Sequence, residues 1–276
     1  MNRTLFAAIL PVLLLGACAA AQEPSAPADD ASAAADAAKA GADAWDAVLA
    51  GAWREAGNVA RDRYRHPRET LTFFGVTPQQ TVVEITPGGG WYAEILAPYL
   101  RDGGHYVAAV TKADSLQAKF GADAGQYGKA EIVVFDPKAP VFGPAGSADV
   151  VLTFRNAHNW VDAGTEKAYF KGFFDVLKPG GTLGVVDHRA KPGTDIDTMK
   201  KSGYLTEELV IELATGAGFE LAEKSEVNAN PADTADHPNG VWTLPPTNNH
   251  DAADDAKYKA IGESDRMTLK FVKPAE

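Results

Sequence analysis

The stretch TVVEITPGGGWYAEIL, residues 81–96, joins a strand to a helix through three consecutive glycines. Its first five residues are β-branched or apolar apart from Glu84, and its last six have a helical composition. Glycine in a turn costs backbone entropy, so three in a row favour a role beyond a change of direction. Without side chains, Gly88, Gly89 and Gly90 let a ligand approach the backbone N–H groups at the start of the helix. The alternative is a tight turn that holds no ligand.

Outside this stretch, apolar β-rich runs alternate with helical patterns, which implies parallel strands buried on both faces. No helical pattern separates the last two strands, so we predict that this pair is antiparallel. The expected fold is α/β, with a doubly wound, mostly parallel seven-stranded sheet and an antiparallel last strand. The predicted strands are residues 81–85, 105–110, 131–136, 149–154, 182–188, 220–227 and 267–273, and the predicted helices are residues 67–74, 91–100, 115–120, 164–181 and 205–219.

The N-terminus has the pattern of a targeting segment. Residues 1–17 contain Arg3 and an apolar core too short to span a bilayer, and they read as a signal peptide. Leu-Gly-Ala-Cys before residue 19 resembles the lipobox of bacterial lipoproteins, with Cys18 as the lipid-modified residue; a plain secretory signal cleaved near Ala20 is the alternative. We therefore expect an exported, periplasmic lipoprotein that contacts the membrane through an anchor at Cys18. Residues 18–44 are expected to form a flexible tether and residues 45–276 the folded domain.

Composition narrows the class of partner. The formal net charge is −11 and no basic cluster occurs, which argues against a nucleic-acid partner. A single cysteine leaves the chain without an internal disulfide. The polar segment Asn228–Asp265 is long enough to suggest a lid or substrate loop. Within it we expect Asp233, His237 and His250 to be solvated, and Asp265 and Arg266 to form a surface ion pair.

The glycine turn also matches the dinucleotide pattern G-x-G-x-x-A, as Gly88, Gly90 and Ala93. A nicotinamide site additionally needs an acid about 20 residues further on, to bind the ribose hydroxyls. The corresponding region is YVAAVTK, with no acid before Asp114. A nicotinamide-dependent oxidoreductase is therefore disfavoured.

Over residues 63–274 the chain resembles class I S-adenosylmethionine-dependent methyltransferases. The resemblance is carried by VVEITPGGGWYAEIL, VVFDP, ADVVLTFRNAHNW, FFDVLKPGGTLGVVDH and RMTLKFVKP. The Lys-Pro-Gly-Gly turn between a helix and the fifth strand is the most specific of these pieces. More narrowly, the chain resembles a group of exported bacterial proteins described as predicted methyltransferases, which have HNW and DHR at strand ends.

This resemblance implies S-adenosylmethionine as cofactor. The family's first-motif acid corresponds to Glu84, and the acid near the adenine corresponds to Asp136. The usual ribose-binding acid is missing, so Thr111 or Asp114 would have to substitute, and Pro87 stiffens the glycine loop. The implied cofactor-binding residues are Glu84, Thr86, Gly88, Gly89, Gly90, Thr111, Asp136 and Asn156.

Polar residues at the predicted ends of the fourth and fifth strands are the candidates for chemistry. Methyl transfer mainly requires alignment of a nucleophile and exclusion of water, and a general base helps where the nucleophile is protonated. We expect His158 to be that base; a surface or capping histidine is the alternative. Asp187 would orient a histidine or bind substrate, unless it pairs with Arg189. His188 is a further candidate, and no ligand spacing supports a metal site.

The expected substrate pocket contains seven residues, for several of which ordinary packing or a surface position is the alternative: Tyr64, Arg68, Trp91, Tyr92, Asn159, Trp160 and Arg189. The predicted function is a methyltransferase acting on a small-molecule acceptor. The cofactor is made in the cytoplasm, whereas this chain is expected to be exported, and nothing in the sequence shows how the two would meet. A ligand-binding protein on a methyltransferase scaffold is therefore the competing hypothesis.

Overall fold

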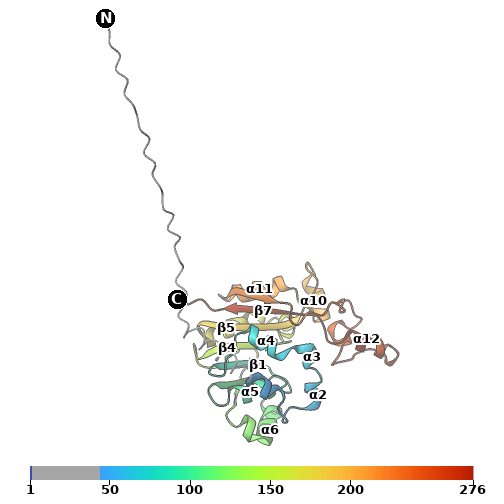
Figure 1. Cartoon of the computed structure of the whole chain (residues 1–276). Helices are drawn as coiled ribbons and strands as arrows, with labels where there is room; N and C mark the ends of the chain where they lie inside the picture. The colour runs from blue at the N-terminus through green and yellow to red at the C-terminus, as the bar shows by residue number, and fades with distance from the viewer. Residues whose placement is uncertain (2–43, 276) are drawn as a thin grey trace. The chain divides into compact units, whose positions relative to one another are not determined.

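The computed structural model describes residue 1 and residues 44–275 (Figure 1). The predicted signal peptide after its first residue, the predicted lipid-modification site Cys18 and all but the last residue of the predicted tether therefore lie outside the described residues. Within residues 44–275, none of the helices has the length and hydropathy that crossing a bilayer requires.

Seven strands form one sheet in the order β3-β2-β1-β4-β5-β7-β6. The pairs among β1 to β5 are parallel, and β7 is antiparallel to both of its neighbours, which confirms the predicted architecture. The strands are β1 (Thr81–Ile85), β2 (His105–Val110), β3 (Glu131–Val134), β4 (Ala148–Phe154), β5 (Leu177–His188), β6 (Glu220–Ser225) and β7 (Arg266–Val272).

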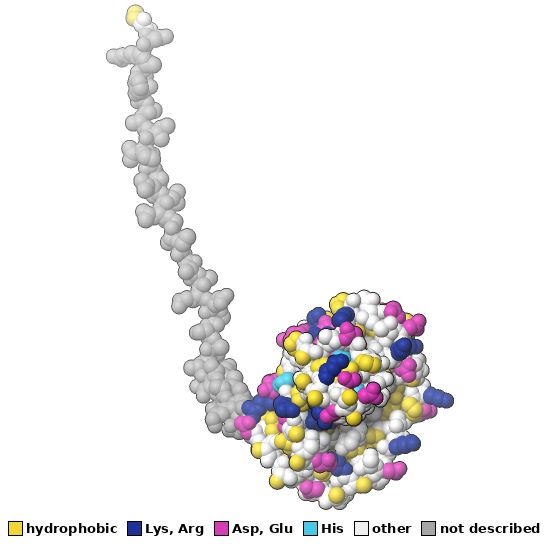
Figure 2. Space-filling model, turned by 90° about the vertical axis from the view of Figure 1, so that its right-hand side faces the viewer, with side chains coloured by type: hydrophobic (Ala, Val, Ile, Leu, Met, Phe, Trp, Pro, Cys, Tyr) yellow, Lys and Arg dark blue, Asp and Glu magenta, His cyan; other side chains and the backbone are white. Residues whose placement is uncertain are grey.

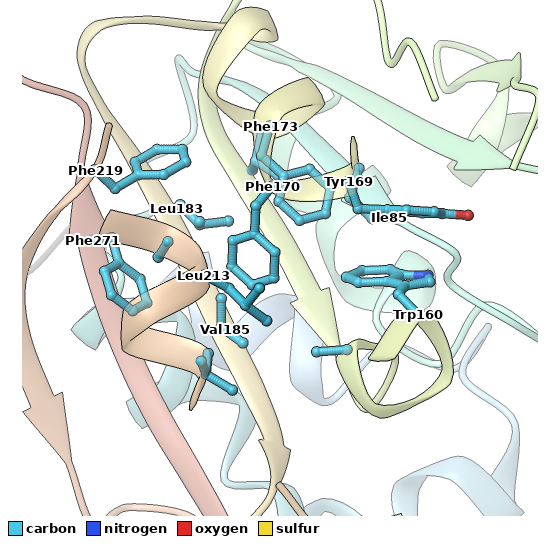
Figure 3. Packing of buried hydrophobic residues seen from close by; sticks show 14 of the residues in the cluster. Ile85, Trp160, Tyr169, Phe170, Phe173, Leu183, Val185, Leu213, Phe219 and Phe271 are labelled. Carbon is cyan, nitrogen blue, oxygen red and sulfur yellow. The ribbon is translucent and has the colours of Figure 1, made fainter. Parts of the chain in front are cut away.

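Helices pack on both faces of the sheet. One apolar cluster joins the sheet to α8 (Ala157–Ala163), α9 (Glu166–Val176) and α11 (Glu207–Gly216), and Figure 3 shows part of it. The other joins the sheet to α4 (Pro67–Phe73), α5 (Ala93–Leu100), α6 (Asp114–Ala122) and α7 (Ala124–Tyr127). Burial on both faces explains why strands such as β1 and β2 are apolar almost throughout.

Local sequence explains where several elements begin and end. α9 ends at Val176, before the Lys-Pro-Gly-Gly segment, and β5 already begins at Leu177 with a register shift against β4, so the predicted helix is too long at its C-terminus. The side chain of Thr206 accepts a hydrogen bond from the Leu209 amide and caps α11. Residues 44–49 are also helical, and Trp45 is buried and stacked on Tyr99 at 3.6 Å.

The segment between β6 and β7 is more ordered than a polar loop. It contains η1 (Gly240–Thr243), η2 (Ala252–Asp254) and α12 (Asp255–Ile261), while α10 (Ile196–Ser202) packs beside η1. The side chains of Asp233, His237 and His250 are buried there, so the expectation that they are solvated is wrong. His237 bonds Asp233 at 2.8 Å, which satisfies both polar groups away from water.

Candidate functional site

A cavity of about 340 Å³ lies where β1 and β4 end. Its floor comes from the ends of β1, β4 and β5 and the start of β7, and its wall comes from α2 (Ala56–Val59), α3 (Asp62–Arg65) and the residues beside them. In doubly wound sheets, ligands bind at this edge. The lining residues are Glu55, Asn58, Arg61, Arg65, Glu84, Thr86, Pro87, Gly88, Gly89, Trp91, Tyr92, Phe154, Arg155, Asn156, Val186 and Arg266.

Two of the three glycines present bare backbone to open space. A Cβ added to Gly88 or Gly89 would meet no heavy atom within 4 Å, and both residues line the cavity. Gly90 differs, because its Cβ would lie 3.1 Å from Leu116 Cδ2 and 3.2 Å from Lys119 Cδ, and it does not line the cavity. The absence of a side chain at Gly90 therefore allows α6 to pack against the turn. Gly88 and Gly89 are the glycines that a ligand in the cavity could contact.

The strand ends beside the turn hold unusual backbone conformations. Thr86 after β1 has φ 52° and Arg155 after β4 has φ 63°, in the left-handed region that costs energy for residues other than glycine. Asn156 links the two ends, since its side-chain amide donates to the carbonyl oxygens of Ile85 at 3.0 Å and Thr86 at 3.3 Å. Such strain persists where the surroundings fix it, and it is common at binding sites.

Glu84 is buried beneath the cavity and accepts a 2.6 Å hydrogen bond from the Tyr106 hydroxyl. Burial raises the pKa of Glu84 to about 7, although Tyr106 and the charge of Arg65 act in the opposite direction. The cavity therefore contains a carboxyl group that changes charge near neutral pH.

We predict that Glu84→Gln stabilises the ligand-free protein increasingly as pH rises. The raised pKa means that folding favours the protonated form, so the stability this group contributes is complete below its ordinary pKa of 4.5 and is lost as pH rises through about 7. The shift corresponds to about 3 kcal/mol. Denaturant unfolding at pH 4.5 and pH 8 measures the difference. A difference between variant and wild type that does not vary with pH would contradict the prediction; Glu220→Gln, on exposed β6, is the control.

Aromatic residues, α2 and the residues between α2 and α3 close the cavity. The Trp91 indole N–H donates to the Asn58 carbonyl at 2.9 Å, and the Arg65 guanidinium lies 4.6 Å from the Trp91 ring centroid. Tyr92 stacks on Phe154 at 3.6 Å. Trp91 and Tyr92, predicted as pocket residues, thus line the cavity and fix its wall.

The predicted catalytic residues form a compact buried cluster. Asp187 Oδ1 accepts hydrogen bonds from His158 Nδ1 at 2.9 Å and from the His188 amide at 2.7 Å, and Oδ2 accepts from the His158 amide at 3.2 Å. His188 Nδ1 lies 2.5 Å from Ser264 Oγ. The first contact orients the His158 ring and leaves its Nε2 as the acceptor nitrogen. Burial lowers the pKa of His188 well below its usual value, and the charge of Arg155 acts in the same direction.

This cluster adjoins the cavity without lining it. Neither histidine nor Asp187 is among the lining residues, so the role of His158 as a base stays a prediction. The side chains of His158, Asp187 and His188 offer donor atoms within 4.8 Å of one another, a spacing compatible with a cation. Both oxygens of Asp187 already accept hydrogen bonds from the protein.

Other predicted cofactor residues lie outside the cavity. Thr111 follows β2 and Asp136 follows β3, and both are exposed. Asp136 Oδ1 accepts from the Lys138 amide at 2.9 Å. The cavity therefore lies at the ends of β1 and β4. Thr111 and Asp136, beyond the ends of β2 and β3 where the resemblance places the adenosine, are exposed to solvent.

Five predicted pocket residues are also placed elsewhere. Trp160 lies in the core, stacked on Tyr169 at 4.2 Å (Figure 3). Arg189 is held by Glu207, Glu226 and Asp265, so the predicted pair of Asp265 with Arg266 does not form. The remaining three are Tyr64, which stacks with Arg63, Arg68, which pairs with Asp46, and Asn159, which is exposed.

The lining also contains four arginines that are not among the predicted site residues: Arg61, Arg65, Arg155 and Arg266. They come from three distant segments of the chain and match no local motif. Arg155 had a usable signal, because it directly follows a predicted buried strand at the edge where ligands bind.

Solved structures with this arrangement are methyltransferases in several cases. A SAM-dependent methyltransferase from Aquifex aeolicus is 14% identical over 78% of this chain and 93% of its own, with a TM-score of 0.54. A putative sarcosine dimethylglycine methyltransferase from Galdieria sulphuraria is 15% identical over 80% of this chain and 88% of its own, with a TM-score of 0.56. No family model and no curated protein sequence matches the chain.

The chain therefore has the fold of class I S-adenosylmethionine-dependent methyltransferases. The [4+2]-cyclase SpnF is similar as well, at 16% identity over 77% of this chain and 81% of its own, with a TM-score of 0.54. The fold thus does not by itself fix the reaction.

Proposed function

We propose that this protein is an S-adenosylmethionine-dependent methyltransferase acting on a small-molecule acceptor. The observation that carries the proposal is the bare backbone of Gly88 and Gly89 at the rim of a cavity above the ends of β1 and β4. A methyltransferase fold with a filled turn at this place would have no room for the cofactor. Export to the periplasm, inferred from residues 1–18, remains part of the proposal on sequence grounds alone.

The residues around the cavity suit the methionine part of the cofactor. Gly88 and Gly89 would contact it along the backbone, and Asn156 would keep the ends of β1 and β4 at fixed separation. Glu84 in its ionised form would favour the positive charges of the cofactor. The bound cofactor would supply a methyl group on a sulfonium sulfur. An aligned nucleophile would attack the methyl carbon, and the carbon–sulfur bond would break to release S-adenosylhomocysteine.

The acceptor would enter between the turn and the wall formed by Trp91, Tyr92 and the segment before α3. These aromatic side chains exclude water, and exclusion of water strengthens the electrostatic interactions inside the cavity. His158, oriented by Asp187, is the proposed base if the acceptor must lose a proton; His158→Ala should then lower the transfer rate without lowering cofactor affinity.

Titration calorimetry on the full-length protein tests the proposal. We expect S-adenosylmethionine and S-adenosylhomocysteine to bind with dissociation constants in the micromolar range and NAD to produce no heat of binding. Absence of binding by both sulfur compounds at millimolar concentration would refute the proposed function. Binding without methyl transfer to any tested acceptor would favour a ligand-binding protein on this scaffold.

A further inference from the structure

Four guanidinium groups line the cavity. Arg61 and Arg65 come from α3 and its N-terminal flank, Arg155 follows β4, and Arg266 begins β7. On the face of the molecule shown in Figure 2, basic and acidic side chains are interspersed. The lining also contains Glu55 and Glu84, so arginines outnumber acidic residues there by four to two in a protein whose formal net charge is −11.

One buried carboxylate serves three of these arginines. Glu263 is 3% exposed and lies 2.6 Å from Arg61 Nε, 3.3 Å from Arg65 Nε and 3.0 Å from Arg266 Nη2. The second buried carboxyl group, Glu84, is neutral in part at pH 7 because its pKa is about 7. A third carboxylate, Glu55 of the lining, pairs with Lys119 at 2.7 Å, so positive charges still outnumber negative charges around the cavity.

Donors from two of the arginines have no acceptor. The side chain of Arg155 has no hydrogen-bond or ion-pair partner within residues 44–275, although its backbone is fixed at the end of β4. Arg61 Nη2 is buried and equally without a partner in that range. Burial and the charges of Arg266 and Arg61 lower the pKa of Arg155 to about 10. Arg155 is half-buried, and a charge that is partly removed from water and has no counterion is stabilised by a bound anion.

We propose that these arginines bind an oxyanion group, a carboxylate or phosphate, of the methyl acceptor, with Arg155 and Arg61 donating to it. The proposal rests on the proposed function and specifies its substrate class. Guanidinium groups match the geometry of such oxyanions and can bind them through two parallel hydrogen bonds.

The carboxylate of the cofactor is the competing source of the same chemistry. The sheet order places β4, β5 and β7 successively further from the glycine turn after β1. Adjacent strands are about 4.8 Å apart, so the start of β7 lies about 14 Å from the end of β1 along the sheet. A cofactor held at Gly88 and Gly89 leaves the part of the cluster around Arg266 and Arg61 to a second molecule, whereas Arg155, which follows β4 directly beside β1, lies between the two places.

Inorganic phosphate is the probe for this site. Calorimetry on the full-length protein saturated with S-adenosylhomocysteine should show phosphate binding, and Arg155→Gln should weaken it at least tenfold. Arg155→Lys should weaken it less, because the charge is retained while the paired donors are lost. Arg63→Gln is the matched control, because this substitution removes the same charge from an exposed residue that does not line the cavity. Circular dichroism checks that each variant is folded.

The outcomes separate the two proposals. Phosphate binding that is unchanged in Arg155→Gln overturns the oxyanion site. Phosphate binding that disappears when S-adenosylhomocysteine is added overturns the acceptor assignment, because the anion then occupies the place of the cofactor carboxylate. If S-adenosylhomocysteine does not bind, the proposed function fails, whereas phosphate binding to the free protein that depends on Arg155 still supports the oxyanion site.

Discussion

Gly89→Val is expected to weaken binding of S-adenosylhomocysteine by about 30- to 100-fold and to leave the melting temperature nearly unchanged. Gly89 lines the cavity and does not have a positive φ, and a Cβ there meets nothing within 4 Å. The fold can therefore accept valine, while the added methyl groups occupy space that the ligand needs. Overpacking typically costs about 1–3 kcal/mol, and a cost of about 2.0–2.7 kcal/mol within that range gives the stated change in affinity.

Two other glycines make this prediction specific. Gly121→Val in α6 adds the same side chain where it also meets nothing within 4 Å, but Gly121 does not line the cavity, so affinity should be unchanged. Gly90→Val should lower the melting temperature, because φ is +84° and Leu116 and Lys119 are in the way. Equal affinities of Gly89→Val and wild type, measured by calorimetry, would remove the glycine turn from the binding site.

The sheet could be predicted because its determinants are local in sequence. Each parallel strand is an apolar run flanked by a turn and a helical pattern, and such runs suit burial on both faces. Glu84, inside β1, is implied as a site residue by the resemblance to methyltransferases. The turn could be placed at the cavity because it follows β1, and ligands bind at that edge. Asn156 after β4 is placed there by the same rule.

The cavity wall could not be predicted because it depends on contacts between distant segments. Arg61 and Arg65 are held at the cavity by hydrogen bonds to Glu263, about two hundred residues later in the chain. No spacing in the sequence predicts that pairing. Trp160 shows the complementary error. It lies in α8, where its side chain meets Tyr169 of α9 in the core, whereas the neighbouring Asn159 is exposed. A position just after a strand places a residue at the carboxyl edge of the sheet, but it does not say whether the side chain of a helical residue there faces the core or the solvent.

Glu263→Gln is expected to destabilise the protein by about 3–5 kcal/mol at pH 7, since removing one partner leaves buried charges uncompensated. Glutamine keeps the shape of the side chain but not its charge, and three arginines lose their common counterion. Burial alone would raise the pKa of Glu263, but the charges of Arg266 and Arg65 outweigh it and lower the pKa to about 2. Denaturant unfolding measures the loss.

The pH dependence identifies the carboxylate as the cause. A lowered pKa means that the stability from Glu263 is present above its ordinary pKa of 4.5 and is lost as pH falls through about 2. The difference between wild type and Glu263→Gln should therefore shrink over that interval. Asp175→Asn, which breaks an exposed pair with Lys171, should cost less than about 1 kcal/mol at any pH.

Phosphate connects this result to the oxyanion site. If the arginines lack a counterion in Glu263→Gln, saturating phosphate should raise the melting temperature of this variant more than that of the wild type, because a ligand stabilises the state to which it binds. The comparison remains informative if the variant is only marginally stable. A loss below about 1 kcal/mol at pH 7, or equal stabilisation of both proteins by phosphate, would show that the four guanidinium groups do not form one electrostatic unit.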